Sequence, residues 1–521
     1  MNFSKYQTIT LLCTGMLLGT AGCSNLDDTV LGKLSSTEAT GTGGVAIDPA
    51  SSLQGVYSAL NSFADQANQY ALEEHSSDEM QGPTRGTDWD DFGTWRKLHQ
   101  HTWDSQHNQI IDAWNNLNSG VFKATQTISV ASNNAAIKAE AQFLRAFFMF
   151  YVVDLYGQVP VREATDAADA NPKVLDRSAA TDYILADLAA AIPVLPSVTA
   201  STNNKASKEA AQFLLAKVLL NKAVYKQSPA TPAGPFTFAK ADMDAAIVAC
   251  NTIMSSGKFS IQPKGGYFDM FAPDNTALSK ENIFVIANDN SSQPGNVRNR
   301  YYMGLHYSQQ PSGWNGFTTL ADFYNSFDKA DERLGKAYPG VTDKIGTRAG
   351  FLVGQQYDEK GVALKDRSGN PLVFTPDVNL SYATEAKGIR VMKYVPQPGF
   401  LDNPSNDYVF FRYADVVLMK AEAILRGGTD PMGQTAEKLV NDLRANRSVA
   451  AKTPIDLKAI LAERGFELYY EGWRRNDQIR FGTFLDPVDN RPTKSADTKV
   501  VYPIPQRALD SNPNLKQNPG Y

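Results

Sequence analysis

Two clusters of aromatic and polar residues could bind a ligand, and the chemistry they favour is the recognition of sugars. The C–H face of a pyranose or furanose ring packs on an aromatic side chain, while carboxylate, amide and guanidinium groups hydrogen-bond to its hydroxyls. The first cluster spans Arg85–Trp95 and the second spans Tyr301–Asn315. From these clusters and one later position we predict the ligand-binding residues Trp89, Asp90, Trp95, Tyr301, Trp314, Asn315 and Arg390.

The tryptophans have two interpretations, as ligand-facing residues or as core. Trp89 and Trp314 are flanked by Gly, Asp and Asn, which is typical of loops that a scaffold presents to solvent. We therefore expect both indoles to face a ligand, with Asp90, Asn315 and Arg390 fixing its hydroxyls. The alternative, packing between helices, is our interpretation of Trp103 and Trp114, which lie in a helical pattern.

Signatures of other chemistries are weak. His99, His101 and His107 crowd one region, but the H-x-H-x₅-H spacing is not a usual zinc pattern. The aspartates of the first cluster lack the spacing of an EF-hand calcium loop, so we predict no cofactor and no metal. The sequence contains no H-E-x-x-H, G-x-S-x-G or P-loop motif. A glycosidase carboxylate pair is defined by separation in space, so hydrolysis stays open as an alternative.

The last quarter of the chain contains the clearest structural signals. Apolar residues recur at helical spacing over 413–426, which Gly427 can close, and further helices are expected over 434–447 and 456–472. Tyr502–Pro505 predicts a stiff extended arm. The charges of the third helix lie three and four positions apart, where opposite charges pair. We interpret them as part of the fold and not as a catalytic site: Glu463, Arg464, Glu467, Glu471, Arg474 and Asp477.

This region resembles the SusD/RagB family of nutrient-binding outer-membrane lipoproteins of Bacteroidetes. The matching motifs are Arg412–Ala423, Glu463–Asp477, Tyr502–Pro505 and Gln517–Tyr521. The resemblance implies a mainly α fold, a degenerate tetratricopeptide-like helix-pair scaffold with a loop-rich irregular insertion. It also implies that loops at the two aromatic clusters help to form a glycan site.

The same resemblance implies a non-catalytic function. A protein of this family captures an oligosaccharide or polysaccharide at the cell surface and passes it to a SusC-like TonB-dependent transporter in the outer membrane. Two alternatives remain. The first is a peptide-binding protein, because some relatives carry oligopeptides, on which an aromatic loop could also stack. The second is a secreted glycoside hydrolase. A hydrolase would need two functionally sensitive carboxylates, whereas a binding protein needs its aromatic side chains.

The start of the chain predicts export and lipid anchoring. Residues 1–22 are typical of a lipoprotein signal peptide, because Lys5 precedes an apolar run, Ile9–Leu18, that is too short to span a bilayer. The following Thr20–Cys23 resembles a lipobox, although leucine is usual where Thr20 stands. Cys23 is therefore the predicted lipidation site. Its acyl chains would anchor the protein in the outer membrane. The following Ser24–Asp28 resembles the acidic sequence that sends Bacteroidetes lipoproteins to the cell surface, which implies that the protein faces the cell exterior.

We expect one large domain behind this anchor. Residues 23–52 form the lipidated N-terminus and tether, and residues 53–521 form a single SusD-like domain. Within that domain we predict a helical part at 53–261, a loop-rich insertion at 262–407, and C-terminal helices with a terminal arm at 408–521.

The charge of the chain argues against a nucleic-acid partner, and its cysteine content argues against a disulfide framework. The 521 residues carry a net charge of -5 and no run of Lys or Arg, so we expect no nucleic-acid partner. The three cysteines are Cys13, Cys23 and Cys250. Removal of the signal peptide and lipidation leave Cys250 alone, which excludes a disulfide framework and predicts a small core residue.

Overall fold

The structure is a computed structural model that describes residues 47–163, 166–167, 169–199 and 201–521. The predicted signal peptide, the lipidation site Cys23 and most of the tether lie outside these residues. Contacts separate the chain into two units, and the second, Ile47–Ala164 with Asn171–Tyr521, contains all the helices and strands that the structure describes. The predicted boundaries at 53, 262 and 408 stay predictions.

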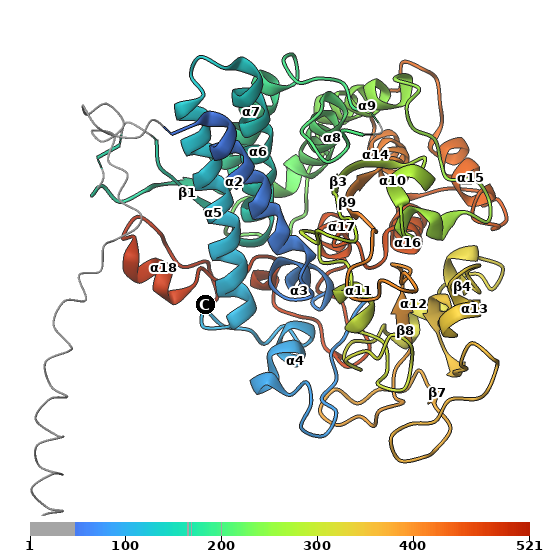
Figure 1. Cartoon of the computed structure of the whole chain (residues 1–521). Helices are drawn as coiled ribbons and strands as arrows, with labels where there is room; N and C mark the ends of the chain where they lie inside the picture. Colours follow the sequence, from blue (N-terminus) through green and yellow to red (C-terminus); the bar gives the residue numbers. More distant parts are fainter. Residues whose placement is uncertain (1–46, 164–165, 168, 200) are drawn as a thin grey trace, which may run out of the picture. The chain divides into compact units, whose positions relative to one another are not determined.

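Helices are the main regular elements of this unit, as predicted (Figure 1). The longer ones are α2 (Pro49–Ala59), α5 (Asn108–Val130), α6 (Ala135–Tyr156), α7 (Arg177–Ala191), α8 (Lys208–Tyr225), α9 (Lys240–Ser255), α14 (Tyr413–Leu425), α15 (Ala436–Ala445), α16 (Leu457–Leu468) and α17 (Arg474–Phe481). The shorter ones are α3 (Asn68–Glu74), α4 (Thr94–His99), α10 (Asn275–Leu278), α11 (Asn299–Tyr302), α12 (Ala321–Asn325), α13 (Thr342–Ile345) and α18 (Gln506–Ser511). Consecutive long helices pack together, α5 on α6, α6 on α7, α7 on α8 and α8 on α9.

Helix α6 lies at the centre of the helical part. The Asn134 side chain accepts a hydrogen bond from the Ile137 N–H at its start, and Gly157, with φ of 70°, ends it. Its residues 143–156 are buried on all sides, which explains why the run is apolar without being amphipathic. No helix among the described residues is both long enough and apolar enough to cross a membrane.

The strands are short, and one pair of them connects the insertion to the rest of the unit. They are β1 (Gln158–Val161), β2 (Lys173–Asp176), β3 (Asn282–Ile286), β4 (Gly335–Lys336), β5 (Ala349–Leu352), β6 (Gly354–Gln355), β7 (Val373–Phe374), β8 (Arg390–Met392) and β9 (Tyr408–Arg412). Antiparallel β3 and β9 join the start of the insertion to the C-terminal block. The order β4-β5-β8 forms a small antiparallel sheet inside the insertion.

The C-terminal block differs from the prediction in one element. The helix expected over 456–472 ends at Leu468 as α16, and a separate helix, α17, begins after a turn at Arg474. In this turn Tyr470 has φ of 60° and Gly472 has φ of 78°, values that a right-handed helix does not contain. The charged residues therefore pair between elements. Arg464 bonds to Asp477 of α17 at 2.7 Å and to Asp415 of α14 at 2.8 Å.

Glu467 is the centre of a buried ion cluster. Its carboxylate accepts hydrogen bonds from Arg333 of the insertion at 2.9 Å, from Arg412 at 2.7 Å, and from Arg447 at 2.9 and 3.0 Å. Burial acts to raise the pKa of Glu467, but the three guanidinium groups outweigh it and hold the pKa well below its usual value. This arrangement confirms that these charges bind α16 to its neighbours. The predicted core residues Trp103, Trp114 and Cys250 are also buried.

Candidate functional site

The first aromatic cluster forms a loop that neighbouring segments hold in an unusual backbone conformation. Gln81 pairs with Thr318, and Arg85 pairs with Asp88. Beyond this point three side-chain-bearing residues have positive φ: Trp89 at 61°, Asp91 at 39° and Phe92 at 56°. Such conformations are strained for residues other than glycine, and they persist where surrounding structure enforces them, often at binding sites.

This backbone conformation exposes one ring fully. Phe92 is 93% exposed at the tip of the loop, although leaving a large apolar side chain in water forgoes the stabilisation that burial would give. The Trp95 ring, three residues later, turns inward and donates its Nε1–H to Asp91 at 2.7 Å. The strained turn thus directs one aromatic ring to solvent and the next into the core.

Trp89 and Trp314 meet, although 225 positions separate them. The Trp89 Nε1–H donates to the Trp314 carbonyl at 2.9 Å. A side chain at Gly316 would lie 2.6 Å from the Trp89 ring, so glycine is what lets the two loops approach. The Trp314 ring stacks on Tyr302, with centroids 5.6 Å apart and an angle of 20° between the planes. Both indoles are partly exposed.

Four predicted site residues are buried and hydrogen-bonded to other protein groups, so their positions do not allow direct contact with a ligand. Trp95 and Tyr301 lie in the core, and the Tyr301 hydroxyl bonds to the Leu401 carbonyl. Asn315 and Arg390 are fully buried and bond to each other at 2.7 Å. Arg390 also bonds to the Glu385 and Lys387 carbonyls. Burial holds the pKa of Arg390 well below its usual value. These residues position the loops.

Asp90 is the remaining predicted residue, and it is exposed. Its carboxylate pairs with Arg96 at 2.9 Å, with about half of the Asp90 side chain open to solvent. Arg96 also donates a hydrogen bond to the Thr84 hydroxyl. The Thr84 carbonyl in turn accepts a hydrogen bond from the Ala383 N–H at 2.9 Å. A second loop therefore borders the first one, and it presents Tyr382, which is 71% exposed.

This surface is completed by other members of the two clusters, Asp88, Tyr302 and Tyr307, and by Arg367 and Asp402 from outside them. The Tyr307 hydroxyl donates to Asp88 at 2.8 Å, and Arg367 lies 4.0 Å over the Tyr307 ring. The Tyr302 hydroxyl donates to Asp402 at 3.0 Å. Burial is the main cause that raises the pKa of the Tyr302 and Tyr307 phenols to about 12, and these hydrogen bonds are the second cause. Both phenols are therefore neutral at physiological pH. We use the name aromatic face for Trp89, Phe92, Tyr302, Tyr307, Trp314 and Tyr382.

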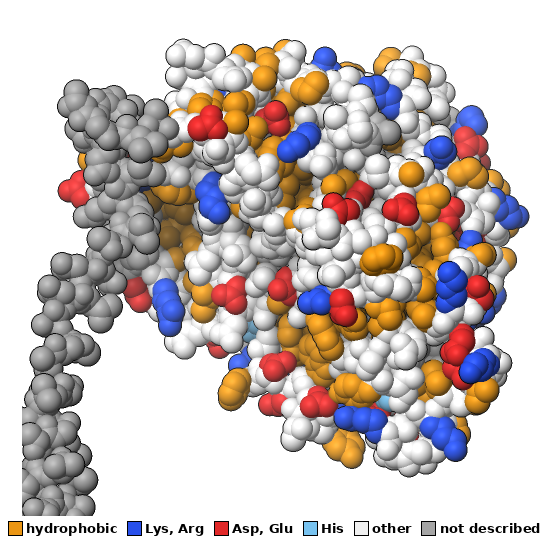
Figure 2. Space-filling model, viewed as in Figure 1, with side chains coloured by type: hydrophobic (Ala, Val, Ile, Leu, Met, Phe, Trp, Pro, Cys, Tyr) orange, Lys and Arg blue, Asp and Glu red, His pale blue; other side chains and the backbone are white. Residues whose placement is uncertain are grey.

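The aromatic face combines aromatic rings with hydrogen-bond donors and hydrogen-bond acceptors. The carboxylates Asp88, Asp90 and Asp402 accept hydrogen bonds, and Arg367 donates its Nε–H to Glu385. This combination suits a polyhydroxylated ligand with apolar C–H faces. Figure 2 shows acidic and basic side chains interspersed over the side in view, with no broad basic stripe there.

A groove adjoins the Tyr302–Trp314 segment. It has a volume of about 970 Å³ and is lined by the rings of Tyr324, Tyr338, Phe351 and Tyr357. Gln356 on its wall accepts a hydrogen bond from Gln309 at 3.4 Å. The groove is therefore a second place where a long ligand could lie.

The carboxylates with strongly raised pKa lie elsewhere, inside the protein. Glu73, Glu74 and Glu79 are buried, and burial raises the pKa of each. Glu74 and Glu79 accept backbone N–H bonds from the turn between α16 and α17, at Gly472 and Tyr470. A general acid must contact its substrate, so these carboxyl groups do not form a glycosidase pair in this structure.

Glu74 leads to a prediction about pH. Burial raises its pKa to about 7, against the hydrogen bond from Gly472. Between pH 4.5 and 7 the folded protein holds this proton and the unfolded chain does not, so stability falls as pH rises through this range. We expect Glu74→Gln, which cannot ionise, to be more stable than the wild type by about 1–3 kcal/mol at pH 8 and nearly equal at pH 4.5.

Denaturant unfolding at these two pH values measures the difference. The matched control is Glu359→Gln, whose glutamate is exposed and whose substitution should change stability by less than about 0.5 kcal/mol. A stability difference between Glu74→Gln and the wild type that is the same at both pH values would contradict the assignment.

His99, His101 and His107 each bond to a backbone carbonyl. The Nε2–H of His99 donates to the Asp489 carbonyl at 2.7 Å, and the Nε2–H of His107 donates to the Thr94 carbonyl at 3.0 Å. Burial lowers the pKa of His99 to about 4. Within the part of the chain that the structure describes, no three His, Cys, Asp or Glu side chains are grouped for a metal ion.

Comparisons with known proteins identify relatives for both halves of the chain. Residues 280–521 match a family model described as SusD family, and residues 41–220 match one described as starch-binding associating with outer membrane. The starch-binding protein SusD of Bacteroides thetaiotaomicron is 26% identical over 436 residues, which cover 74% of this chain and 72% of that protein.

Solved structures share the fold at lower sequence identity. A laminarin-binding SusD-like protein superposes with a TM-score of 0.67 and 20% identity, covering 91% of this chain and 99% of the other. Surface glycan-binding protein A of Bacteroides thetaiotaomicron, solved with laminarihexaose, superposes with a TM-score of 0.64 and 18% identity, covering 90% and 98%. At these identities the likeness shows the mainly helical SusD-like fold alone.

Proposed function

This chain belongs to the SusD/RagB family, and we propose that it is a cell-surface lipoprotein that binds an oligosaccharide on its aromatic face and delivers it to a partner TonB-dependent transporter. The observation that carries the proposal is the meeting of Trp89 and Trp314. Two partly exposed indoles from distant loops lie together, and Asp88 and Asp90 flank Trp89 in the chain. The names of relatives that bind starch and laminarin support a glycan as the ligand.

In this proposal the rings and the polar groups have separate roles. Sugar rings stack on Trp314 and Phe92, which have accessible surfaces, while Asp90 and Arg367 bond to hydroxyls. Affinity per sugar is modest, because hydroxyl groups exchange water for protein with little net gain. The buried Asn315–Arg390 pair acts indirectly by fixing the loop that carries Trp314.

The protein binds its ligand without cleaving it. The carboxylates of the aromatic face are paired: Asp88 with Tyr307, Asp90 with Arg96, and Asp402 with Tyr302 and Arg298. Hydrolysis of a glycoside needs one protonated and one ionised carboxyl group on either side of the scissile bond. The carboxyl groups whose pKa is strongly raised, such as Glu74, are buried away from solvent.

A calorimetric titration of the purified full chain with laminarihexaose and maltohexaose tests the proposal. We expect saturable binding of at least one of these glycans, and chromatography after the titration should recover the hexasaccharide intact. Binding of oligopeptides with no binding of a wider glycan panel would contradict it, as would release of shorter sugars that one Asp or Glu substitution abolishes.

Membrane attachment is proposed to depend on Cys23. It stands in a lipobox-like sequence, and acyl chains on one cysteine bury methylene groups at ~0.8 kcal/mol each. We expect Cys23→Ala to move the protein from the outer-membrane fraction to the soluble fraction when it is expressed in a Bacteroidetes host. The control is Cys250→Ala, which alters a buried cysteine and should stay in the membrane fraction. Membrane retention of Cys23→Ala at the wild-type level would disprove the anchor.

A further inference from the structure

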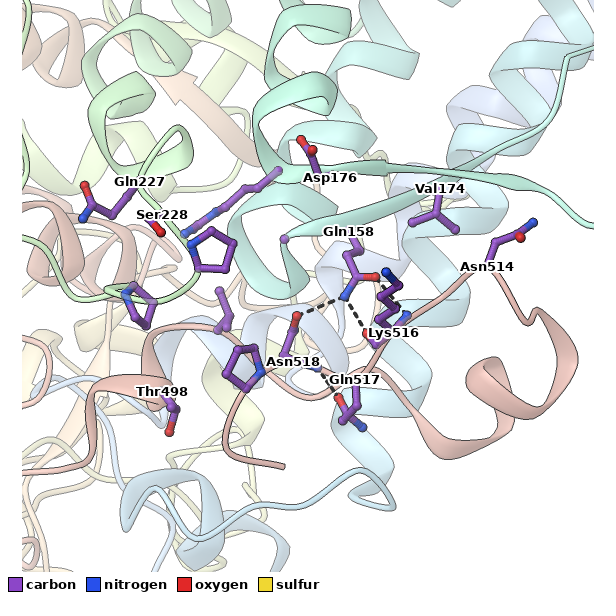
Figure 3. Close-up of a pocket in the computed structure, with 16 residues that line it drawn as sticks. Gln158, Val174, Asp176, Gln227, Ser228, Thr498, Asn514, Lys516, Gln517 and Asn518 are labelled. Carbon is purple, nitrogen blue, oxygen red and sulfur yellow. Dashed lines mark hydrogen bonds between the residues drawn. The ribbon is translucent and has the colours of Figure 1, made fainter.

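A cavity of about 390 Å³ lies apart from the aromatic face, and none of the residues of that face lines it. It is formed by β1, β2, the start of α7, the loop after α8 and the C-terminal segment (Figure 3). Its volume falls within the range of small-molecule sites, ~300–1,000 Å³. One side chain on its wall, Arg177, carries a charge that no carboxylate among the described residues pairs with.

Arg177 is held in place on two sides. Its Nε–H donates to the Val153 carbonyl at 3.2 Å and its Nη2–H to the Asp154 carbonyl at 3.5 Å, at the C-terminal end of α6. Its guanidinium also lies 5.0 Å from the centroid of the Tyr225 ring. A guanidinium has five N–H donors in a planar fork, so three donors, on Nη1 and Nη2, remain for another partner.

No carboxylate of the described chain pairs with Arg177. The nearby Asp154 carboxylate is occupied by Arg475 at 2.7 Å, Asn476 at 2.6 Å and Tyr225 at 2.9 Å. Asp176 accepts from the Ala179 N–H at 2.8 Å as the cap of α7. In Figure 3 its carboxylate is directed upward, away from Thr498 and Gln517. Burial lowers the pKa of Arg177, although the charge of Asp154 acts in the opposite direction.

The other walls of the cavity are suited to a carbon skeleton. Val174, Val501, Pro229 and Pro232 supply apolar surface, and the exposed Lys516 adds a second cation at the rim. An immobilised guanidinium with a free donor edge matches the geometry of a carboxylate, which accepts two parallel N–H bonds. We propose that this cavity is a second ligand site, which binds a small organic carboxylate through the free donor edge of Arg177.

The apolar walls define the class of ligand further. An inorganic anion would pair with Arg177 but leave the Val and Pro surfaces in contact with water, whereas a carboxylate with a compact carbon body covers both. Such a ligand could be a branched aliphatic acid or a sugar acid, which share the carboxylate and differ in the polarity of the body.

Calorimetric titration of the purified full chain with four probes tests the site. The two test ligands are isovalerate, which represents the aliphatic acids, and D-glucuronate, which represents the sugar acids. The two controls are isovaleramide, the neutral counterpart of isovalerate, and inorganic phosphate, an anion without a carbon body. We expect one of the two carboxylates to bind with a Kd on the order of 1 mM, and isovaleramide and phosphate to bind at least tenfold more weakly.

Two variants separate binding at this cavity from binding elsewhere. Arg177→Gln should weaken carboxylate binding at least tenfold, and Ser228→Trp, at an exposed position on the rim, should block the cavity without touching Arg177. Both should bind glycans on the aromatic face as the wild type does. Absence of saturable carboxylate binding, equal binding of isovaleramide, or unchanged binding in Ser228→Trp would each overturn the proposal.

Discussion

Replacing Glu467 by alanine is expected to lower the free energy of unfolding by about 3–5 kcal/mol, because it leaves three buried guanidinium groups without their shared carboxylate. Arg333, Arg412 and Arg447 all bond to Glu467, and all four side chains are fully buried. Urea unfolding followed by circular dichroism measures the change. A protein whose total stability is ~5–15 kcal/mol would lose a large part of it.

The control for this prediction is an exposed ion pair in the same block. Lys438 and Asp442 pair at 2.7 Å, with 62% of each side chain exposed, so Asp442→Ala should change stability by less than about 1 kcal/mol. An equally small effect of Glu467→Ala would mean that the cluster does not hold the insertion to α16. Intact stability with lost glycan binding would show that the block is a site and not scaffold.

The aromatic face carries the second large effect. We expect Trp314→Ala and Phe92→Ala each to weaken binding of the hexasaccharide at least tenfold, or about 1.4 kcal/mol, because each removes a stacking surface. Phe92→Ala should leave the melting temperature unchanged, since the ring is 93% exposed. Trp89→Ala should weaken binding too, but it should also lower stability, because the Trp89 ring packs on Phe317 at 4.8 Å.

Two controls separate stacking from general damage. Phe122→Ala removes a half-exposed ring of α5 that is not part of the aromatic face, and it should leave both affinity and stability nearly unchanged. Trp114→Ala should cost about 3–5 kcal/mol of stability, because this indole is buried against Tyr156 with centroids 5.0 Å apart. If Trp114→Ala alone reduced affinity and the loop variants alone unfolded, the aromatic face would be part of the core.

The sequence predicted the helical scaffold because its signals are local. Apolar spacing, caps and ordered motifs occur within one element, and the extents of α14 and α15 agree with the predicted helices to within a few residues. The predicted helix over 456–472 was wrong at its end, because apolar spacing continued through a turn that Tyr470 and Gly472 make with positive φ. The partnership of Glu467 with Arg333, 134 positions away, has no local signal.

The binding residues were predicted less well for the same reason. Flanking Gly, Asp and Asn mark a loop, but they do not say whether another loop covers it. Trp314 is partly exposed, while its neighbour Asn315 is fully buried on Arg390. Phe92 lies between Asp91 and Gly93, and nothing in the sequence distinguishes it from the other aromatic residues of the first cluster. Its exposure follows from the strained backbone around it, which only the structure shows.

A crystal structure of the full chain with whichever hexasaccharide binds is the most direct test of the central claim. The account predicts sugar rings stacked on Trp314 and Phe92, with hydroxyls within hydrogen-bonding distance of Asp90 or Arg367 and with every glycosidic bond intact. A hexasaccharide bound only in the groove at Tyr357 or in the cavity at Arg177, with the aromatic face empty, would contradict it.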